Sequence, residues 1–139
     1  MIPSETLAWR AAQRLAHKRV AFTNGCFDLL HTGHLALLTA ARQAADALIV
    51  AVNTDSSTRR LKGDKRPIVP ELERVELLLA LEPVDQVVLF DEDTPLQAIL
   101  ALHPDVLVKG ADWSEENIVG AAEVKGWGGE VVRVPLRAG

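Results

Sequence analysis

The sequence predicts an α/β fold, a doubly wound sheet of five parallel strands with helices on both faces. Two observations predict it. Short runs rich in Val, Ile and Leu alternate with longer segments of helical period. These runs are apolar at consecutive positions, as strands buried on both faces of a parallel sheet are. With 139 residues the chain has room for one domain with a core, so we expect a single domain over residues 1–139.

The first part of the chain supplies two helices and two strands. Ser4 is a suitable N-cap for a helix that reaches about His17. The apolar stripe of that helix contains Leu7, Ala11 and Leu15. The next expected elements are a strand over residues 20–23, a helix over 33–45 and a strand over 47–53.

A polar and basic stretch over residues 54–69 is expected to be a loop. After Pro70, residues 71–82 have helical period, with Leu72, Val75 and Leu79 on the expected inner face. The remaining expected elements are a strand over 84–90, a helix from the cap at Thr94 to Leu102, a strand over 105–110, a helix from Ser114 to the glycine at 126, and a strand over 130–136.

The order of these elements predicts a Rossmann-like topology with right-handed crossovers. In such sheets, ligands bind beyond the carboxyl ends of the strands. The loops that follow Thr23, Val52, Phe90 and Val108 should therefore share one edge of the sheet.

Composition limits the classes of partner. A net charge of −4 and a pI near 5.5 argue against a broad nucleic-acid surface. The single cysteine, Cys26, excludes an intrachain disulfide and favours a reducing compartment. We find no apolar run of signal-peptide or membrane-spanning type, so we expect a cytoplasmic protein without a membrane partner.

Residues 24–34, NGCFDLLHTGH, hold most of the functional information. A helix that starts near residue 31 or 32 places His31 and His34 on one face of its first turn, and Gly33 leaves room beside its backbone. Free N–H groups and the helix dipole form an anion site there. Asn24 and Gly25 allow the tight turn that must precede it. Two imidazoles at this point favour binding of a phosphate.

Three other readings of the segment stay open. Asp28, His31 and His34 could bind a metal, although we see no further ligand cluster. The histidines could only cap and pack the helix. Cys26 could be a nucleophile, although a lone cysteine after a strand is more often a small apolar residue.

Two more segments lie at the expected binding edge. One is RRLKGDKRP, which could clamp a triphosphate with its five basic residues, Arg59, Arg60, Lys62, Lys65 and Arg66. The other is LVKGADW, which brings Lys109, Gly110, Asp112 and Trp113 to the same edge. The chain lacks G-x-x-x-x-G-K-[ST], and no G-x-G-x-x-G follows its first strand, so P-loop and dinucleotide-dehydrogenase classes lose their main support.

The sequence resembles the H-x-G-H nucleotidyltransferases, and most closely the branch that adenylylates D-glycero-β-D-manno-heptose 1-phosphate. The matching stretches cover most of the chain from Val20 onward: TNGCFDLLHTGH, VAVNTD, RRLKGDKRPIVPELERVELLLAL, VDQVVLFDEDTP and PDVLVKGADW. The resemblance implies that ATP, normally with Mg²⁺, reacts with the sugar 1-phosphate to give ADP-heptose and pyrophosphate. It implies no metal ligand in the protein itself.

The resemblance also implies roles for individual residues. His31 and His34 would stabilise charge on the α-phosphate, helped by backbone N–H groups near Cys26 and Phe27. Lys62 would hold the other phosphates or the sugar phosphate. The remaining implied contacts are Lys65 and Arg66 with the phosphates or the substrate, Arg74 with the phosphates, and Lys109, Gly110, Asp112 and Trp113 around the nucleotide and acceptor.

Members of the family have a Ser-Thr-Thr segment after the last strand that helps bind the triphosphate, and this sequence stops at Gly139, where that segment would begin. The resemblance further implies a possible homodimer and a separate heptose kinase. The main alternative activity is a cytidylyltransferase for glycerol 3-phosphate or a similar phosphorylated alcohol. A non-catalytic nucleotide-binding module and a metal-dependent hydrolase are two further alternatives.

Overall fold

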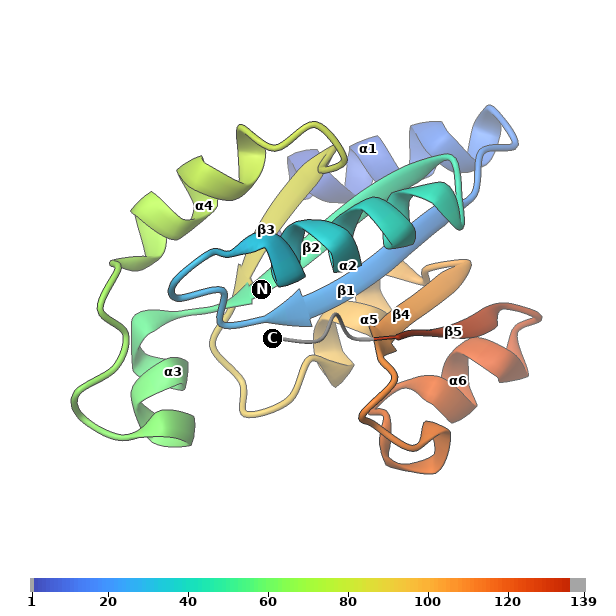
Figure 1. Ribbon diagram of the computed structural model, residues 1–139. Coiled ribbons are helices and arrows are strands. Elements are labelled where there is room, and N and C mark those ends of the chain that lie inside the picture. Colours follow the sequence, from blue (N-terminus) through green and yellow to red (C-terminus); the bar gives the residue numbers. More distant parts are fainter. Residues whose placement is uncertain (1, 136–139) are drawn as a thin grey trace.

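A computed structural model describes residues 2–135 of the chain and contains one five-stranded parallel sheet (Figure 1). The order of the strands is β3-β2-β1-β4-β5, so the predicted parallel α/β fold is confirmed. The strands are β1 (Val20–Gly25), β2 (Ala47–Asn53), β3 (Gln86–Phe90), β4 (Val106–Gly110) and β5 (Glu130–Val134).

Helices cover both faces of this sheet (Figure 1). One face packs against α2 and α4, and the other against α1, α5 and α6. The helices are α1 (Ser4–Leu15), α2 (Thr32–Gln43), α3 (Asp55–Lys62), α4 (Glu71–Leu79), α5 (Leu96–Leu102) and α6 (Ala121–Gly126), with a short 3₁₀ helix η1 (Glu115–Asn117) before α6.

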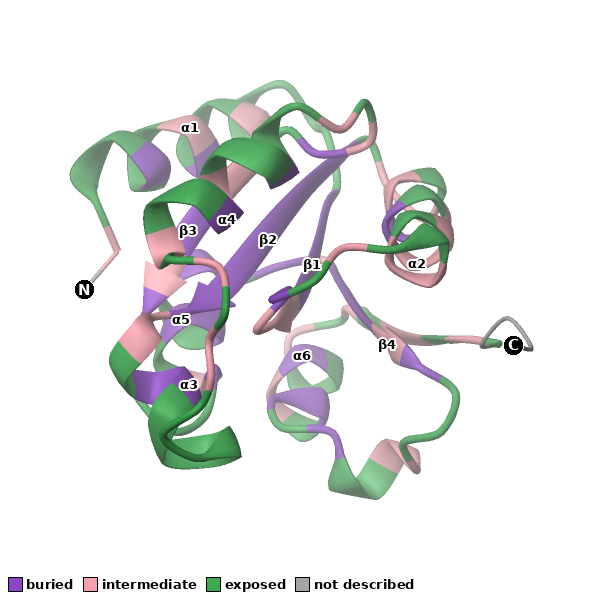
Figure 2. Cartoon of the chain, turned by 60° about the vertical axis from the view of Figure 1, so that its left-hand side comes forward, coloured by how far each residue is buried: buried purple, intermediate pink, exposed green. Residues whose placement is uncertain are grey.

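The central strands form the core. All seven residues of β2 are buried, as the unbroken apolar run predicts for a strand covered on both faces. Phe22 and Ile49 belong to the cluster beneath α5 and α6, whereas Leu48 belongs to the cluster beneath α2 and α4. Figure 2 shows these buried strands between largely exposed helix surfaces. Within residues 2–135 we find no helix with the length and apolar character needed to cross a membrane.

The chain changes direction across the sheet at β1. From β1 it proceeds through β2 to β3 on one side, and it then returns to place β4 and β5 on the other side. The carboxyl ends of β1, β2 and β4 meet at this switch point, which is where an open α/β sheet binds ligands.

The stretch over residues 54–69 is not a continuous loop as predicted, because residues 55–62 form α3. The Thr54 side chain caps this helix by accepting a hydrogen bond from the Ser57 N–H at 3.1 Å. Its buried residues are Ser57 and Thr58. Since the inward face is polar, hydrophobic periodicity does not reveal this helix.

The predicted apolar stripes of α1 and α4 are also wrong. Leu15 is 82% exposed and Leu72 is 73% exposed. The buried positions are instead polar or charged residues: Thr6 and Arg10 in α1, and Arg74 beside Leu78 in α4. In both helices the guanidinium bonds to backbone carbonyl groups inside the fold.

The helix predicted from Ser114 to residue 126 consists of two pieces. The 3₁₀ turn η1 ends at Asn117, and α6 starts only after Gly120, whose φ of +88° breaks the helical path. Other boundaries differ by a few residues from prediction: β1 continues to Gly25, and α4 stops at Leu79. The last strand is described to Val134, and residue 136 of its predicted span lies outside the described residues.

Candidate functional site

Two adjoining cavities open at the carboxyl edge of the sheet. The first has a volume of about 750 Å³ and lies over the β1–α2 turn. Its lining residues are Asn24, Gly25, Cys26, Phe27, Asp28, Leu29, His31, His34, Leu37, Lys62 and Arg66. Eight of the predicted site residues are in this set.

The second cavity has a volume of about 460 Å³ and is more apolar in its lining residues. It lies between the ends of β1, β2, β3 and β4. Among its lining residues are Asn53, Leu61, Phe90, Asp93, Thr94, Pro95, Lys109, Trp113, Asn117, Ile118 and Val119. Asn24, Gly25, Cys26 and Lys62 line both cavities, so a ligand could extend from one into the other.

His31 is the N-cap of α2, which begins at Thr32 as predicted from the sequence. The His31 Nδ1 accepts a hydrogen bond from the Gly33 N–H at 3.0 Å. The His31 N–H donates to the Nδ1 of His34 at 3.2 Å. Both rings are therefore fixed by the backbone at the first turn, with centroids 4.0 Å apart.

This pattern of hydrogen bonds assigns the tautomer of each ring. A ring nitrogen that accepts a hydrogen bond carries no proton, so each neutral imidazole has its proton on Nε2. Both histidines line the first cavity. The site thus holds two Nε2–H donors, close together and beside a helix N-terminus.

The electrostatics of the site keep His34 neutral. Burial lowers the pKa of His34, and the neighbouring His31 and Lys62 lower it further. A neutral His34 preserves the acceptor at Nδ1 that the His31 N–H requires. At neutral pH His34 consequently acts as a hydrogen-bond donor rather than as a cation.

Gly33 makes room for the His31 ring rather than directly for a ligand. A Cβ at residue 33 would lie 2.8 Å from Cε1 and 2.9 Å from Nδ1 of His31. Gly25 has a related role, because a Cβ there would lie 3.0 Å from the Phe27 ring. Phe27 itself has a φ of +50° and its ring centroid is 5.4 Å from that of His34.

Asp28 does not support the metal-site alternative. Its carboxylate accepts hydrogen bonds from the N–H groups of Ile68 and Val69 at 2.9 Å, and from Arg66 at 3.1 Å. Burial would raise the pKa of Asp28, but these donors outweigh burial and lower it. We find no group of three or more metal-ligating side chains within residues 2–135. Asp28 instead ties segment 66–69 to the turn after β1.

Arg74 was expected to contact phosphates, and the structure corrects this. Its side chain is fully buried. The guanidinium donates to the carbonyl oxygens of Cys26, Asn53 and Val69, and it pairs with Asp55 at 2.8 Å. Arg74 thus holds together the ends of β1 and β2 and the start of α4, beneath the cavities.

The five basic residues of the RRLKGDKRP segment do not act as one clamp. Lys62 lines both cavities and Arg66 lines the first. Arg60 binds the segment after β3 instead. Arg59 and Lys65 are exposed and line neither cavity, so the structure does not bring the predicted substrate residue Lys65 to the site.

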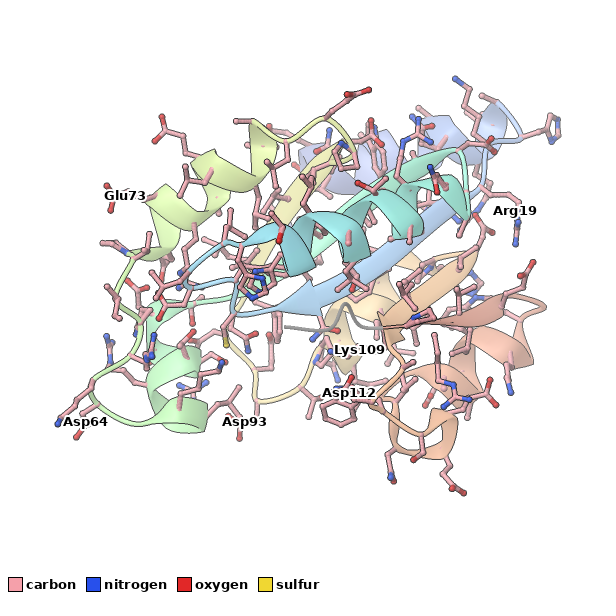
Figure 3. All side chains as sticks on the ribbon, in the orientation of Figure 1. Arg19, Asp64, Glu73, Asp93, Lys109 and Asp112 are labelled. Atoms are coloured by element: carbon pink, nitrogen blue, oxygen red, sulfur yellow. The ribbon has the colours of Figure 1, made fainter. Side chains whose placement is uncertain are left out.

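The LVKGADW segment brings only part of its predicted set to the cavities. Lys109 and Trp113 line the second cavity, with the ammonium 5.4 Å from the Trp113 ring centroid. Burial lowers the pKa of Lys109, although Asp112 and Cys26 favour its charged form. Gly110 and Asp112 line neither cavity, and Figure 3 shows Asp112 beyond Lys109 in the β4–η1 turn.

Several lining residues were not predicted from the sequence. Asn53 and Phe90 close the ends of β2 and β3, so the rule on carboxyl ends could have identified them. Asn117 and Ile118 come from η1 and the residue after it, where no sequence pattern signals a binding role.

Comparison with known proteins shows the family of this chain. The cytidylyltransferase-like family model matches residues 22–136. The curated relatives include the bifunctional protein HldE of Koribacter versatilis (54% identical over 136 residues, 98% of this chain and 28% of the relative) and that of Gluconobacter oxydans (57% over 121 residues, 87% and 25%). The chain therefore spans about a quarter of the length of the curated relatives it matches.

Solved structures agree with the fold. A lipopolysaccharide core biosynthesis protein from Thermoplasma volcanium is 28% identical with a TM-score of 0.71, and the match covers 88% of this chain and 98% of that protein. Pantothenate synthetase from Thermus thermophilus has a TM-score of 0.61 at 22% identity, covering 91% of this chain and 59% of the other, and shows similarity of fold alone.

Proposed function

Because this chain belongs to the cytidylyltransferase-like family, we propose that it transfers AMP from ATP to D-glycero-β-D-manno-heptose 1-phosphate, giving ADP-heptose and pyrophosphate. The observation that carries the proposal is the pair of Nε2–H donors of His31 and His34 in a cavity that also contains Lys62. The HldE relatives at over 50% identity and the lipopolysaccharide core protein support the choice of the heptose branch.

In this reaction an oxygen of the sugar phosphate attacks the α-phosphorus of ATP, and the bond to the leaving pyrophosphate breaks. Negative charge grows on the α-phosphate oxygens and on the leaving group. The Nε2–H groups of His31 and His34 donate to the α-phosphate. Lys62 and Arg66 stabilise the charge of the other phosphates.

Backbone groups supplement these side chains. Within residues 2–135 the N–H groups of Cys26 and Phe27 donate to no other protein group, so they remain available to a phosphate. The nucleoside occupies the second cavity, beside Lys109 and Trp113. Mg²⁺ enters with ATP as part of the substrate complex.

The alternative of a cytidylyltransferase for glycerol 3-phosphate is not favoured, since eight curated relatives at 52% to 57% identity are bifunctional HldE proteins. Supply of the sugar 1-phosphate by a heptose kinase, and association into a homodimer, stay predictions.

The test is pyrophosphate release with Mg²⁺ from ATP and from CTP, each with heptose 1-phosphate and with glycerol 3-phosphate. We expect release from ATP with heptose 1-phosphate. His31→Ala and His34→Ala should each lower turnover by on the order of a hundredfold, as loss of a donor to a developing charge does. His17→Asn, at an exposed histidine beyond α1, is the matched control and should leave turnover unchanged. Nucleotide binding without release would favour the binding-module alternative.

A further inference from the structure

The helix that carries Lys62 depends on the segment after β3 for its position. Helix α3 follows β2 directly. Its buried residues are Ser57 and Thr58, and none of its apolar residues is buried. Apolar packing therefore contributes little to its placement. Polar contacts hold the helix instead. Asp55 at its start contacts Arg74 and Glu71 of α4, and residues 54, 57 and 60 contact residues 91–93.

Three positions along α3 make these contacts. At its start, the Thr54 hydroxyl donates to the Asp91 carboxylate at 2.6 Å. One turn on, the Ser57 hydroxyl donates to the carbonyl of residue 92 at 3.2 Å. In the last turn, Arg60 donates from Nε to the Asp93 carboxylate at 3.0 Å and from Nη2 to the Asp91 carbonyl oxygen.

Of these contacts, those of Arg60 lie nearest to Lys62 along the helix. Lys62 is two residues further along and is the last residue of α3, where Gly63 ends the helix with a φ of +96°. Lys62 lines both cavities, whereas Arg60 lines neither. Asp93 lines the second cavity, and Figure 3 shows it beside the last turn of α3.

We propose that Arg60 is a positioning residue: its contacts with Asp91 and Asp93 fix the last turn of α3 and so hold Lys62 where the nucleotide phosphates bind. The inference rests on the proposed function, because it assigns Lys62 to a nucleotide. It also links the two cavities, since the segment that anchors Arg60 forms part of the wall of the second one.

A general contribution to stability does not explain this arrangement. The side chains of Arg60 and Asp93 are 44% and 73% exposed. Ion pairs with such exposure contribute little to the free energy of unfolding, because water and salt screen them. Their geometric effect remains, and a displacement of about 1 Å in a positioning group can change rates by on the order of a hundredfold.

The experiment is a double-mutant cycle on nucleotide binding. Dissociation constants are measured by calorimetry with Mg²⁺ and α,β-methylene ATP, and in parallel with the corresponding CTP analogue. The four proteins are wild type, Arg60→Ala, Lys62→Ala and the double variant. Arg60→Ala should weaken binding by about tenfold in the wild-type background and by less than about twofold when Lys62 is already absent.

The matched control is Arg59→Ala. Arg59 is exposed, lies next to Arg60, and makes no ion pair with any group in residues 2–135. The Arg59→Ala variant should bind the nucleotide with the same dissociation constant as wild type. Thermal midpoints of all five proteins should agree within a few degrees, which separates loss of position from loss of fold.

Equal weakening by Arg60→Ala in both backgrounds, or no weakening in either, would overturn the inference. The analogue needs no acceptor, so the cycle can be read even if heptose 1-phosphate proves to be the wrong substrate. A wild type that binds the analogue but releases no pyrophosphate with the sugar phosphate contradicts the proposed function alone. A wild type that binds neither analogue contradicts both.

Discussion

Replacing Arg74 by Met tests whether this arginine supports the fold or the phosphates. Met has a similar reach and no charge. The variant loses four hydrogen bonds from a fully buried guanidinium, with donor–acceptor distances of 2.6 to 2.9 Å. It leaves the carbonyl oxygens of Cys26 and Asn53 without this donor, and it leaves Asp55 without its ion-pair partner.

The expected loss follows from these contacts. Removing one member of a buried charged pair reduces the free energy of unfolding by about 3–5 kcal/mol. The side chain of Asp55 is 29% exposed, so water can satisfy part of its charge and the lower end of this range applies. A loss of about 3 kcal/mol corresponds to a fall of roughly 10 °C in the thermal midpoint for a domain of this size.

The assay is urea unfolding followed by circular dichroism, together with a thermal scan. Glu73→Gln is the control, because Glu73 is the exposed neighbour of Arg74 and points away from the sheet (Figure 3). It should unfold within about 0.5 kcal/mol of wild type. An Arg74→Met variant with wild-type stability and weakened ATP binding would refute the reasoning. It would indicate that Arg74 contacts the phosphates.

Three further predictions concern the turn after β1. Gly33→Ala should lower turnover about tenfold or more with little change in thermal midpoint. The new Cβ would lie 2.8 Å from Cε1 of His31 and would displace that ring. Wild-type turnover would mean that the position of the ring is unimportant. Since the pKa of His34 is lowered from 6.5, the acid limb of the pH–turnover profile should lie below that value and shift in His34→Gln; a limb above 6.5 would contradict a neutral donor. Because the folded-state pKa of Asp28 is lowered from 3.8, its ionised form stabilises the fold above that pH, and this contribution disappears as the pH falls through the folded-state pKa. Asp28→Asn should therefore be less stable than wild type at pH 7 and approach it in acid unfolding experiments; an equal difference at both pH values would contradict this.

The apolar pattern predicted the sheet well because its central strands are buried on both faces. Consecutive apolar residues in β1, β2 and β4 have no other stable place in a domain of this length. Parallel strands then require their carboxyl ends to share an edge. The position of the histidine turn followed from the same rule.

The errors in α1, α3 and α4 have one physical cause, which is that polar groups occupy inward positions. Arg10 and Arg74 are buried where apolar periodicity expects Leu or Val, and α3 turns Ser57 and Thr58 inward. Arg10, Arg74 and Ser57 are stable there because their donors reach backbone carbonyls inside the fold. Those partners are distant in sequence, so a local pattern cannot reveal them.

The charges of the site also fit the chemistry of the proposed acceptor. A hydroxyl nucleophile requires a base to take its proton, whereas a phosphate monoester, with a second pKa of about 6, is already an anion at neutral pH. Here the Asp28 carboxylate is occupied by N–H donors, and both histidine Nδ1 atoms accept backbone hydrogen bonds. The lining of the first cavity therefore presents donors and cations but no free carboxylate among the residues described. Such a cavity suits an anionic nucleophile that needs positioning and charge stabilisation, and this favours a sugar phosphate over a sugar hydroxyl as the acceptor.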